Sequence, residues 1–295
     1  MNTLIEGKFG HGSIHQPIRR KIKKALRKSI VASTSPVNWD KGYDVRDTIG
    51  PITIKNQGTS SSCGGQAGSY FIEIHRRLNK LTEGAVSAKS IYAPIHYPNG
   101  GTTINDLERQ IMSQGANLEA SVPSYDAYGA PLSEIMMQDT SWQTDKTRSD
   151  AFTRAGYTPS DIADDIDTVA ANISTWGAVL FEVKGQNGHI PSWLSSTPPA
   201  PMPSTGEPYW YHFMAGVGYK MINGKKAIIC LQSWGNVGDN GVQYLTEDFF
   251  NGGGVVDAFT LIPNAQISPL PSNHSWAATV LRWWRALFKL PVTVN

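Results

Sequence analysis

A cysteine at the predicted start of an amphipathic helix is the residue in this chain best placed for nucleophilic chemistry. Cys63 precedes the periodic run 64–80, and Gln57 stands six residues before it. The positive end of a helix dipole favours a thiolate over a thiol. The side-chain amide of Gln57 can donate to an oxyanion that forms beside the sulfur. Cys63 is therefore the candidate nucleophile and Gln57 a candidate oxyanion donor.

A cysteine nucleophile also needs a partner that moves protons, and His212 is the candidate. It begins the apolar run 212–221, which predicts a strand. An imidazole beside the thiol can hold the thiolate as an ion pair and later protonate a leaving group. Cys63 and His212 together indicate a site that forms a covalent acyl intermediate.

The remaining cysteine and histidines do not suggest a metal site. Cys230 lies in the apolar run 228–231, which predicts a core position. Four further histidines show no ligand spacing with cysteines or carboxylates, namely His75, His96, His189 and His274. We expect neither a metal nor a cofactor.

The elements that must position these residues fall into two halves. Helices are predicted for 64–80, for 103–115 with Thr103 as a capping residue, and for 160–177 with Ser160 as N-cap. Strands follow at 178–183, 212–221, 225–234, 241–246 and 255–262, and Asn223-Gly224 predicts a tight hairpin. A Pro- and Ser-rich loop is expected at 185–208. The predicted class is α+β, with helices first and a mostly antiparallel sheet second.

This order places the nucleophile in the helical half and the histidine in the sheet half. A site that uses both must lie where the two halves meet, in a cleft that grips a substrate from two sides.

Composition limits the setting of such a site. The chain has 295 residues, only two cysteines, and no apolar stretch long enough to span a bilayer. Residues 1–10 lack the basic and apolar regions of a secretory signal. These features favour a cytoplasmic protein.

Charge is distributed unevenly, and the termini differ from the body. Residues 1–36 carry a net charge of +7, which leaves −5 for the rest of a chain whose total is +2. Such a basic arm can dock on nucleic acid, on an anionic membrane or on the body itself, or it can be a solvated tail. Residues 275–290 form a basic amphipathic pattern that fits a membrane, a partner groove or the chain's own domain. We therefore divide the chain into an arm (1–36), a catalytic domain (37–265) and a tail (266–295).

The motifs together resemble the papain-like cysteine peptidases. Residues 50–58 followed by Cys63 resemble that family's opening segment, and His212 follows Cys63 by 149 residues. Further similar segments occur in the same order, namely 99–101, 176–179, 212–219, 233–235 and 239–241. The similarity covers about Tyr43 to Pro263.

The resemblance implies a two-lobe papain-like fold that hydrolyses peptide or protein substrates through a thioester. Cys63 and His212 would be the catalytic pair, and Gln57 would hold the oxyanion. Gln232 stands where the family has the asparagine that orients the histidine. Gly100 and Gly101 would line the substrate's backbone, and Trp234 would cover His212.

Three departures bear on activity. Ser60 replaces the family's first cysteine, which removes a disulfide. Gly64 replaces an aromatic residue beside the nucleophile, which predicts more room and weaker shielding there. Gln232 is one methylene longer than asparagine, so the orienting geometry must shift.

Other functions remain open at this point. The chain can be a papain-like pseudoenzyme that binds peptides or plays a structural part, or an acyltransferase in which an amine resolves the thioester. The resemblance also implies that residues 1–36 restrain the enzyme by occupying the cleft, because peptidases of this fold commonly carry an N-terminal inhibitory segment.

Overall fold

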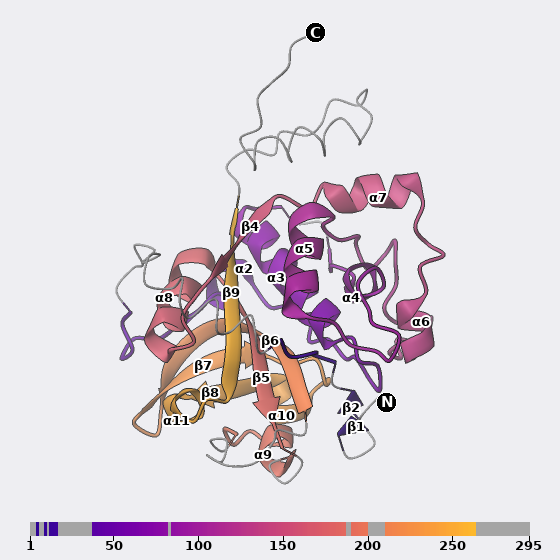
Figure 1. The fold of residues 1–295 in the computed structure, drawn as a ribbon. Coiled ribbons are helices and arrows are strands. Elements are labelled where there is room, and N and C mark those ends of the chain that lie inside the picture. Colours follow the sequence, from indigo (N-terminus) through magenta and orange to yellow (C-terminus); the bar gives the residue numbers. More distant parts are fainter. Residues whose placement is uncertain are drawn as a thin grey trace. The chain divides into compact units, whose positions relative to one another are not determined.

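The computed structural model describes residues 4–5, 9–10, 12–16, 37–81, 84–186, 190–199 and 210–263 (Figure 1). These residues belong to one compact unit that spans Met1–Pro263. Most helices up to residue 152 gather in one lobe, and an antiparallel sheet with the later helices beside it forms the other, which confirms the predicted α+β class. The predicted amphipathic segment 275–290 lies outside the described residues, as does most of the basic arm.

The helices are α2 (Arg46–Ile49), α3 (Cys63–Leu78), α4 (Ala88–Tyr92), α5 (Ile104–Ser113), α6 (Glu134–Gln138), α7 (Asp145–Phe152), α8 (Ile166–Trp176), α9 (Ile190–Leu194), α10 (Val237–Asn240) and α11 (Glu247–Asn251). The strands are β1 (Leu4–Ile5), β2 (Phe9–Gly10), β3 (Tyr43–Asp44), β4 (Tyr157–Asp161), β5 (Val179–Gly185), β6 (Trp210–Ile222), β7 (Lys225–Leu231), β8 (Val242–Thr246) and β9 (Val255–Pro263).

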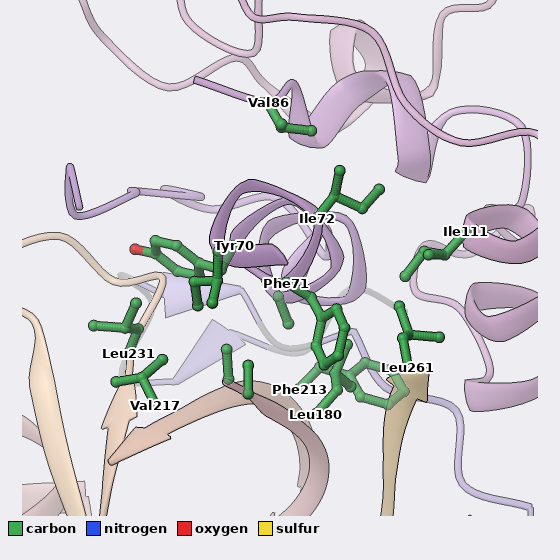
Figure 2. Close-up of a cluster of buried hydrophobic side chains, with 14 of the residues drawn as sticks. Tyr70, Phe71, Ile72, Val86, Ile111, Leu180, Phe213, Val217, Leu231 and Leu261 are labelled. Atoms are coloured by element: carbon green, nitrogen blue, oxygen red, sulfur yellow. The ribbon is translucent and has the colours of Figure 1, made fainter. Parts of the chain in front are cut away.

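Helix α3 lies at the centre of the unit and is buried from Cys63 to His75. Its apolar stripe packs on the sheet, and Figure 2 shows Phe71 beside Phe213 and Leu261. Its opposite side is covered by the helical lobe, where Ile72 faces Val86 (Figure 2). The helix is therefore the shared core of both lobes rather than a surface helix.

The sheet has the order β4-β9-β5-β6-β7-β8, with β3 added beside β6, and every pairing is antiparallel. Strand β6 lies between β5 and β7, so its residues are buried nearly throughout. The hairpin between β6 and β7 turns at Asn223 and Gly224, both with positive φ, as predicted.

The predicted helix 160–177 is wrong at its first end. Ser160 lies inside β4, which pairs with β9, and α8 begins at Ile166. Asp165 is the N-cap and accepts a hydrogen bond from the Thr168 backbone N–H at 2.8 Å. Ser and Asp are both good capping residues, and the pairing of β4 with a distant strand decides between them.

Two further differences affect the site. Strand β7 ends at Leu231 rather than 234, so Gln232 and Trp234 follow the strand instead of continuing it. Within the predicted loop 185–208, residues 190–194 form α9, and Trp193 is fully buried against the sheet lobe.

Candidate active site

Cys63 is the first residue of α3, as predicted, and its side chain is fully buried. Burial raises the pKa of its thiol to about 12, against backbone hydrogen bonds from Phe213, Gly12 and Gly64 that favour the thiolate. The helix start does not by itself produce a thiolate here, because loss of water outweighs it. What covers the sulfur therefore controls its ionisation.

His212 lies on β6 and is fully buried. The hydrogen bond from Phe213 to the sulfur joins Cys63 to the residue that directly follows His212. The ring of Trp234 lies over the imidazole, with 4.5 Å between ring centroids and 33° between planes. The structure thus places Trp234 against His212 and places the residue after His212 at the start of α3; that the imidazole meets the Cys63 sulfur stays a prediction.

The side-chain amide of Gln57 is held in one orientation. Its Oε1 accepts a hydrogen bond from Ser233 Oγ at 2.6 Å, and its Nε2 donates to the Ser60 carbonyl at 2.7 Å. The Gln57 backbone N–H also donates to the Ser233 carbonyl, at 2.8 Å. Ser233 therefore fixes which end of the Gln57 amide can donate. Nothing in the sequence around Ser233 indicates this role.

Gln232 is fully buried just beyond the end of β7. Its Nε2 donates a long hydrogen bond, 3.4 Å, to the Trp193 carbonyl. Its Oε1 accepts no hydrogen bond from the part of the chain that the structure describes. The acceptor that the orienting role requires is present, and that role stays a prediction.

Tyr70 connects the segments that carry the two glutamines. Its hydroxyl accepts a hydrogen bond from the Lys55 backbone N–H at 2.5 Å and donates to the Gln232 carbonyl at 2.9 Å. The sequence indicated only an apolar position for Tyr70, because a hydroxyl's distant backbone partners leave no local pattern.

Near Cys63, serine side chains and Thr102 occupy the space where the papain-like peptidases usually have a disulfide and an aromatic residue. Ser60 Oγ donates to the Gln57 carbonyl at 2.7 Å and lies 2.7 Å from Ser62 Oγ. A Cβ on Gly64 would come within 2.5 Å of Thr102 and 3.3 Å of Phe213. The expectation of extra room beside the nucleophile is therefore wrong, because Thr102 packs into that room.

Residues 12–16, here called the strap, cross the candidate site. The Gly12 carbonyl accepts a hydrogen bond from the Thr102 N–H at 2.7 Å, and the Ile14 N–H donates to the Thr102 carbonyl at 2.9 Å. A Cβ on Gly101 would lie 2.5 Å from the Gly12 oxygen, so the missing side chain lets this backbone approach. The glycine pair thus borders an extended segment, which here is the chain's own.

The strap also contacts the sheet lobe. The Ser13 hydroxyl donates to the carboxylate of Glu182, and His15 Nδ1 lies 2.9 Å from Glu182 Oε2. The His15 ring stacks on Tyr211 with 4.7 Å between ring centroids. No local pattern marks Glu182 in the sequence, because the residues around it are those of an ordinary strand.

Two negative findings apply to the described ranges. No group of three or more histidine, cysteine, aspartate or glutamate residues among them is placed to hold a metal ion. No helix within these ranges has the length and apolar character to cross a bilayer.

Comparison with known proteins gives structural relatives only. No family model matches the sequence, and no curated protein matches it. Xylellain, a cysteine protease from Xylella fastidiosa, is similar in structure, with a TM-score of 0.62, 18% identity, and coverage of 88% of this chain and 96% of xylellain. Bromelain from Ananas comosus has a TM-score of 0.59 at 19% identity, covering 78% of this chain and all of bromelain.

A third similar structure is digestive procathepsin L 3 of the Tenebrio molitor larval midgut. Its TM-score is 0.61 at 18% identity, covering 80% of this chain and 72% of the procathepsin. The fold is papain-like. In this papain-like fold the predicted order of lobes is confirmed, and the candidate pair Cys63 and His212 lies where the lobes meet.

Replacing Tyr70 with phenylalanine tests the connection between these segments. The change leaves the Lys55 N–H and the Gln232 carbonyl buried without their partner, at about 1–3 kcal/mol for each group. We expect the free energy of unfolding in urea to fall by about 2–6 kcal/mol. Phe71→Leu, a change in the same helix that removes no hydrogen bond, serves as the control for lost packing. A Tyr70→Phe loss below that of the control would contradict the bridging role.

Replacing Gln232 with alanine tests the orienting role. The change removes the one carbonyl oxygen proposed to fix the imidazole, so turnover of a peptide substrate should fall about ten- to a hundredfold. Gln232→Asn need not reach the wild-type rate, because the shorter side chain starts from the same backbone position and can fall short of His212. A folded Gln232→Ala protein with the wild-type rate would assign the residue a structural part only.

Proposed function

We propose that this protein is a cysteine peptidase that hydrolyses peptide bonds in peptide or protein substrates through a Cys63 thioester. The observation that carries the proposal is the burial of Cys63, the first residue of α3, in one cluster with Phe213 of β6, which directly follows His212. The papain-like fold supports it, since the similar solved structures include cysteine proteases.

In the proposed reaction the Cys63 thiolate attacks the scissile carbonyl carbon, and His212 carries the proton. A tetrahedral oxyanion forms, and its collapse breaks the C–N bond while His212 protonates the leaving amine. His212 then takes a proton from water, which attacks the thioester and releases the acid. The Trp234 ring over His212 keeps bulk water from the imidazole.

The oxyanion would be held by the Gln57 amide and by the backbone N–H of Cys63. The Gln57 amide nitrogen carries two hydrogens, and its bond to Ser60 uses one of them. Ser233 holds the amide oxygen, so the nitrogen is the end that would donate to an oxyanion. Such preorganised donors stabilise charge that develops only in the transition state.

The strap would restrain this enzyme and lower its activity without abolishing it. It hydrogen-bonds to Thr102 beside the glycine pair, where an extended substrate would bind, and it contributes to the burial that holds the Cys63 thiol protonated. A substrate must displace it before attack can occur. This extends the expectation from the sequence that residues 1–36 restrain the active site.

A covalent probe tests the proposed chemistry. A peptide with a vinyl sulfone should label Cys63 once per chain, and labelling should require His212, because the thiolate is the reacting species. Cys63→Ala should abolish labelling and peptide hydrolysis while the melting temperature changes by only a few degrees. Mass spectrometry of the intact protein gives the number of labels, and peptide mapping gives their position. The control is Cys230→Ala, in which Cys63 should be labelled as in the wild type.

Hydrolysis that survives Cys63→Ala would refute the nucleophile. A folded protein that binds peptides but is neither labelled nor active, even with the strap displaced, would favour the peptide-binding pseudoenzyme.

Gly12→Ala displaces the strap in the full-length chain. A Cβ at this position would lie 1.8 Å from the Ser61 carbonyl oxygen, so the strap must lift. Exposure of Cys63 to water should lower its pKa from about 12 toward the ordinary value near 8.5. The thiolate fraction at pH 7.5 then rises, and we expect alkylation of Cys63 and peptide turnover to increase about tenfold or more.

The pH profile of Cys63 alkylation provides the measurement, with its midpoint moving to lower pH in Gly12→Ala. Gly129→Ala is the control for a glycine substitution away from the strap, because its Cβ would meet nothing within 4 Å; its positive φ makes this a demanding control for backbone strain. Equal alkylation rates in Gly12→Ala and the wild type would show that the strap does not restrain the site.

A further inference from the structure

Glu182 places a buried negative charge beside the candidate nucleophile. It lies on β5 directly opposite Phe213 of β6, and its side chain is 1% exposed. Opposite residues of an antiparallel pair share one face of the sheet, so Glu182 and Phe213 both face α3 and the sulfur. The charge of Glu182 acts on the Cys63 thiol, where it opposes ionisation.

Both oxygens of this carboxylate are satisfied by the strap. Ser13 donates to one oxygen, and His15 Nδ1 lies 2.9 Å from the other. Among the described residues, His15 is the one basic side chain that pairs with Glu182; no lysine or arginine of these ranges does so. Asp257 of β9 stands opposite Glu182 on its other side, which adds a second buried carboxylate to the same row.

A buried carboxylate that loses its partners is costly, because neither water nor another side chain replaces them. The strap and a substrate compete for the same place, since the strap lies along Thr102 and reaches the Cys63 sulfur. A substrate that displaces the strap also removes Ser13 and His15 from Glu182. Productive binding therefore requires the substrate to supply a new donor or cation there.

We infer that Glu182 selects peptide substrates that carry an arginine, lysine or histidine side chain at the position facing it. This rests on the proposed peptidase function and names its substrate class. The guanidinium of arginine suits the site best, because it can bind both carboxylate oxygens at once. An acidic side chain at that position would face Glu182 and Asp257 and be rejected.

The test uses full-length Gly12→Ala protein, in which the strap is displaced. Its substrates are acetylated peptide coumarin amides with arginine at each of the three positions before the scissile amide. Each is matched by a peptide in which citrulline, of the same shape but without charge, replaces the arginine. We expect kcat/KM for arginine to exceed that for citrulline about ten- to a hundredfold at one position.

Variants at Glu182 then assign the preference. Glu182→Gln should reduce the ratio of kcat/KM for the arginine peptide to that for the citrulline peptide to within about threefold of unity. Glu182→Asp keeps the charge and should retain most of the arginine preference. The comparison with Glu182→Gln distinguishes loss of the charge from a change in folding. Glu119→Gln is the matched control: this partly buried glutamate bonds to Ser124, so its substitution should leave both rates unchanged.

Binding distinguishes failure of this inference from failure of the proposed function. The same peptides, labelled with a fluorophore, are titrated into a Gly12→Ala, Cys63→Ala double variant and followed by anisotropy. Arginine preference in binding without turnover in the Gly12→Ala protein would support Glu182 selection and refute the peptidase. Turnover with equal arginine and citrulline rates at all three positions would overturn the inference and leave the peptidase standing. A preference that persists in Glu182→Gln would also overturn it.

Discussion

The hydroxyl of Tyr70 is the contact on which the geometry of the candidate site depends. Cys63 and Tyr70 are seven residues apart on α3, which is close to two full turns, so both project from one face of the helix. The hydroxyl binds Lys55 on the segment that leads to Gln57, and it binds Gln232 beyond β7. One buried helix therefore sets the sulfur, the oxyanion donor and the orienting residue relative to one another.

The ionisation of the nucleophile is decided by water rather than by the helix. A charge at a helix end gains about 0.3–1 kcal/mol, whereas a rise in the thiol pKa to about 12 corresponds to roughly 4 kcal/mol against ionisation. The dipole favours the thiolate only once the sulfur is accessible to water or to its imidazole partner. Under the proposed function, the same helix end thus serves a neutral thiol beneath the strap and a reactive thiolate after the strap leaves.

Sequence reasoning succeeded where the signal is local. Residue alternation located most strands, Asn223-Gly224 marked its hairpin, and ordered motifs indicated the papain-like fold. It failed at β4, a polar strand containing a proline, because its pairing with β9 is set by a distant segment. The contacts of Ser233 with Gln57 and of Ser13 with Glu182 join residues 176 and 169 positions apart, and no local pattern records them.

The carboxylate of Glu182 needs a hydrogen-bond donor or a cation in both states of the protein, with the strap bound and with a substrate bound. The strap satisfies the carboxylate from within the chain, where tethering gives it a high effective concentration. A peptide from solution can compete only if it satisfies the carboxylate at least as well, so a substrate without a donor leaves a buried charge unpaired. Selectivity then arises largely from the penalty on unsuitable substrates rather than from extra attraction to suitable ones. Under the proposed function, a single buried charge in this position couples restraint of the enzyme to its choice of substrate.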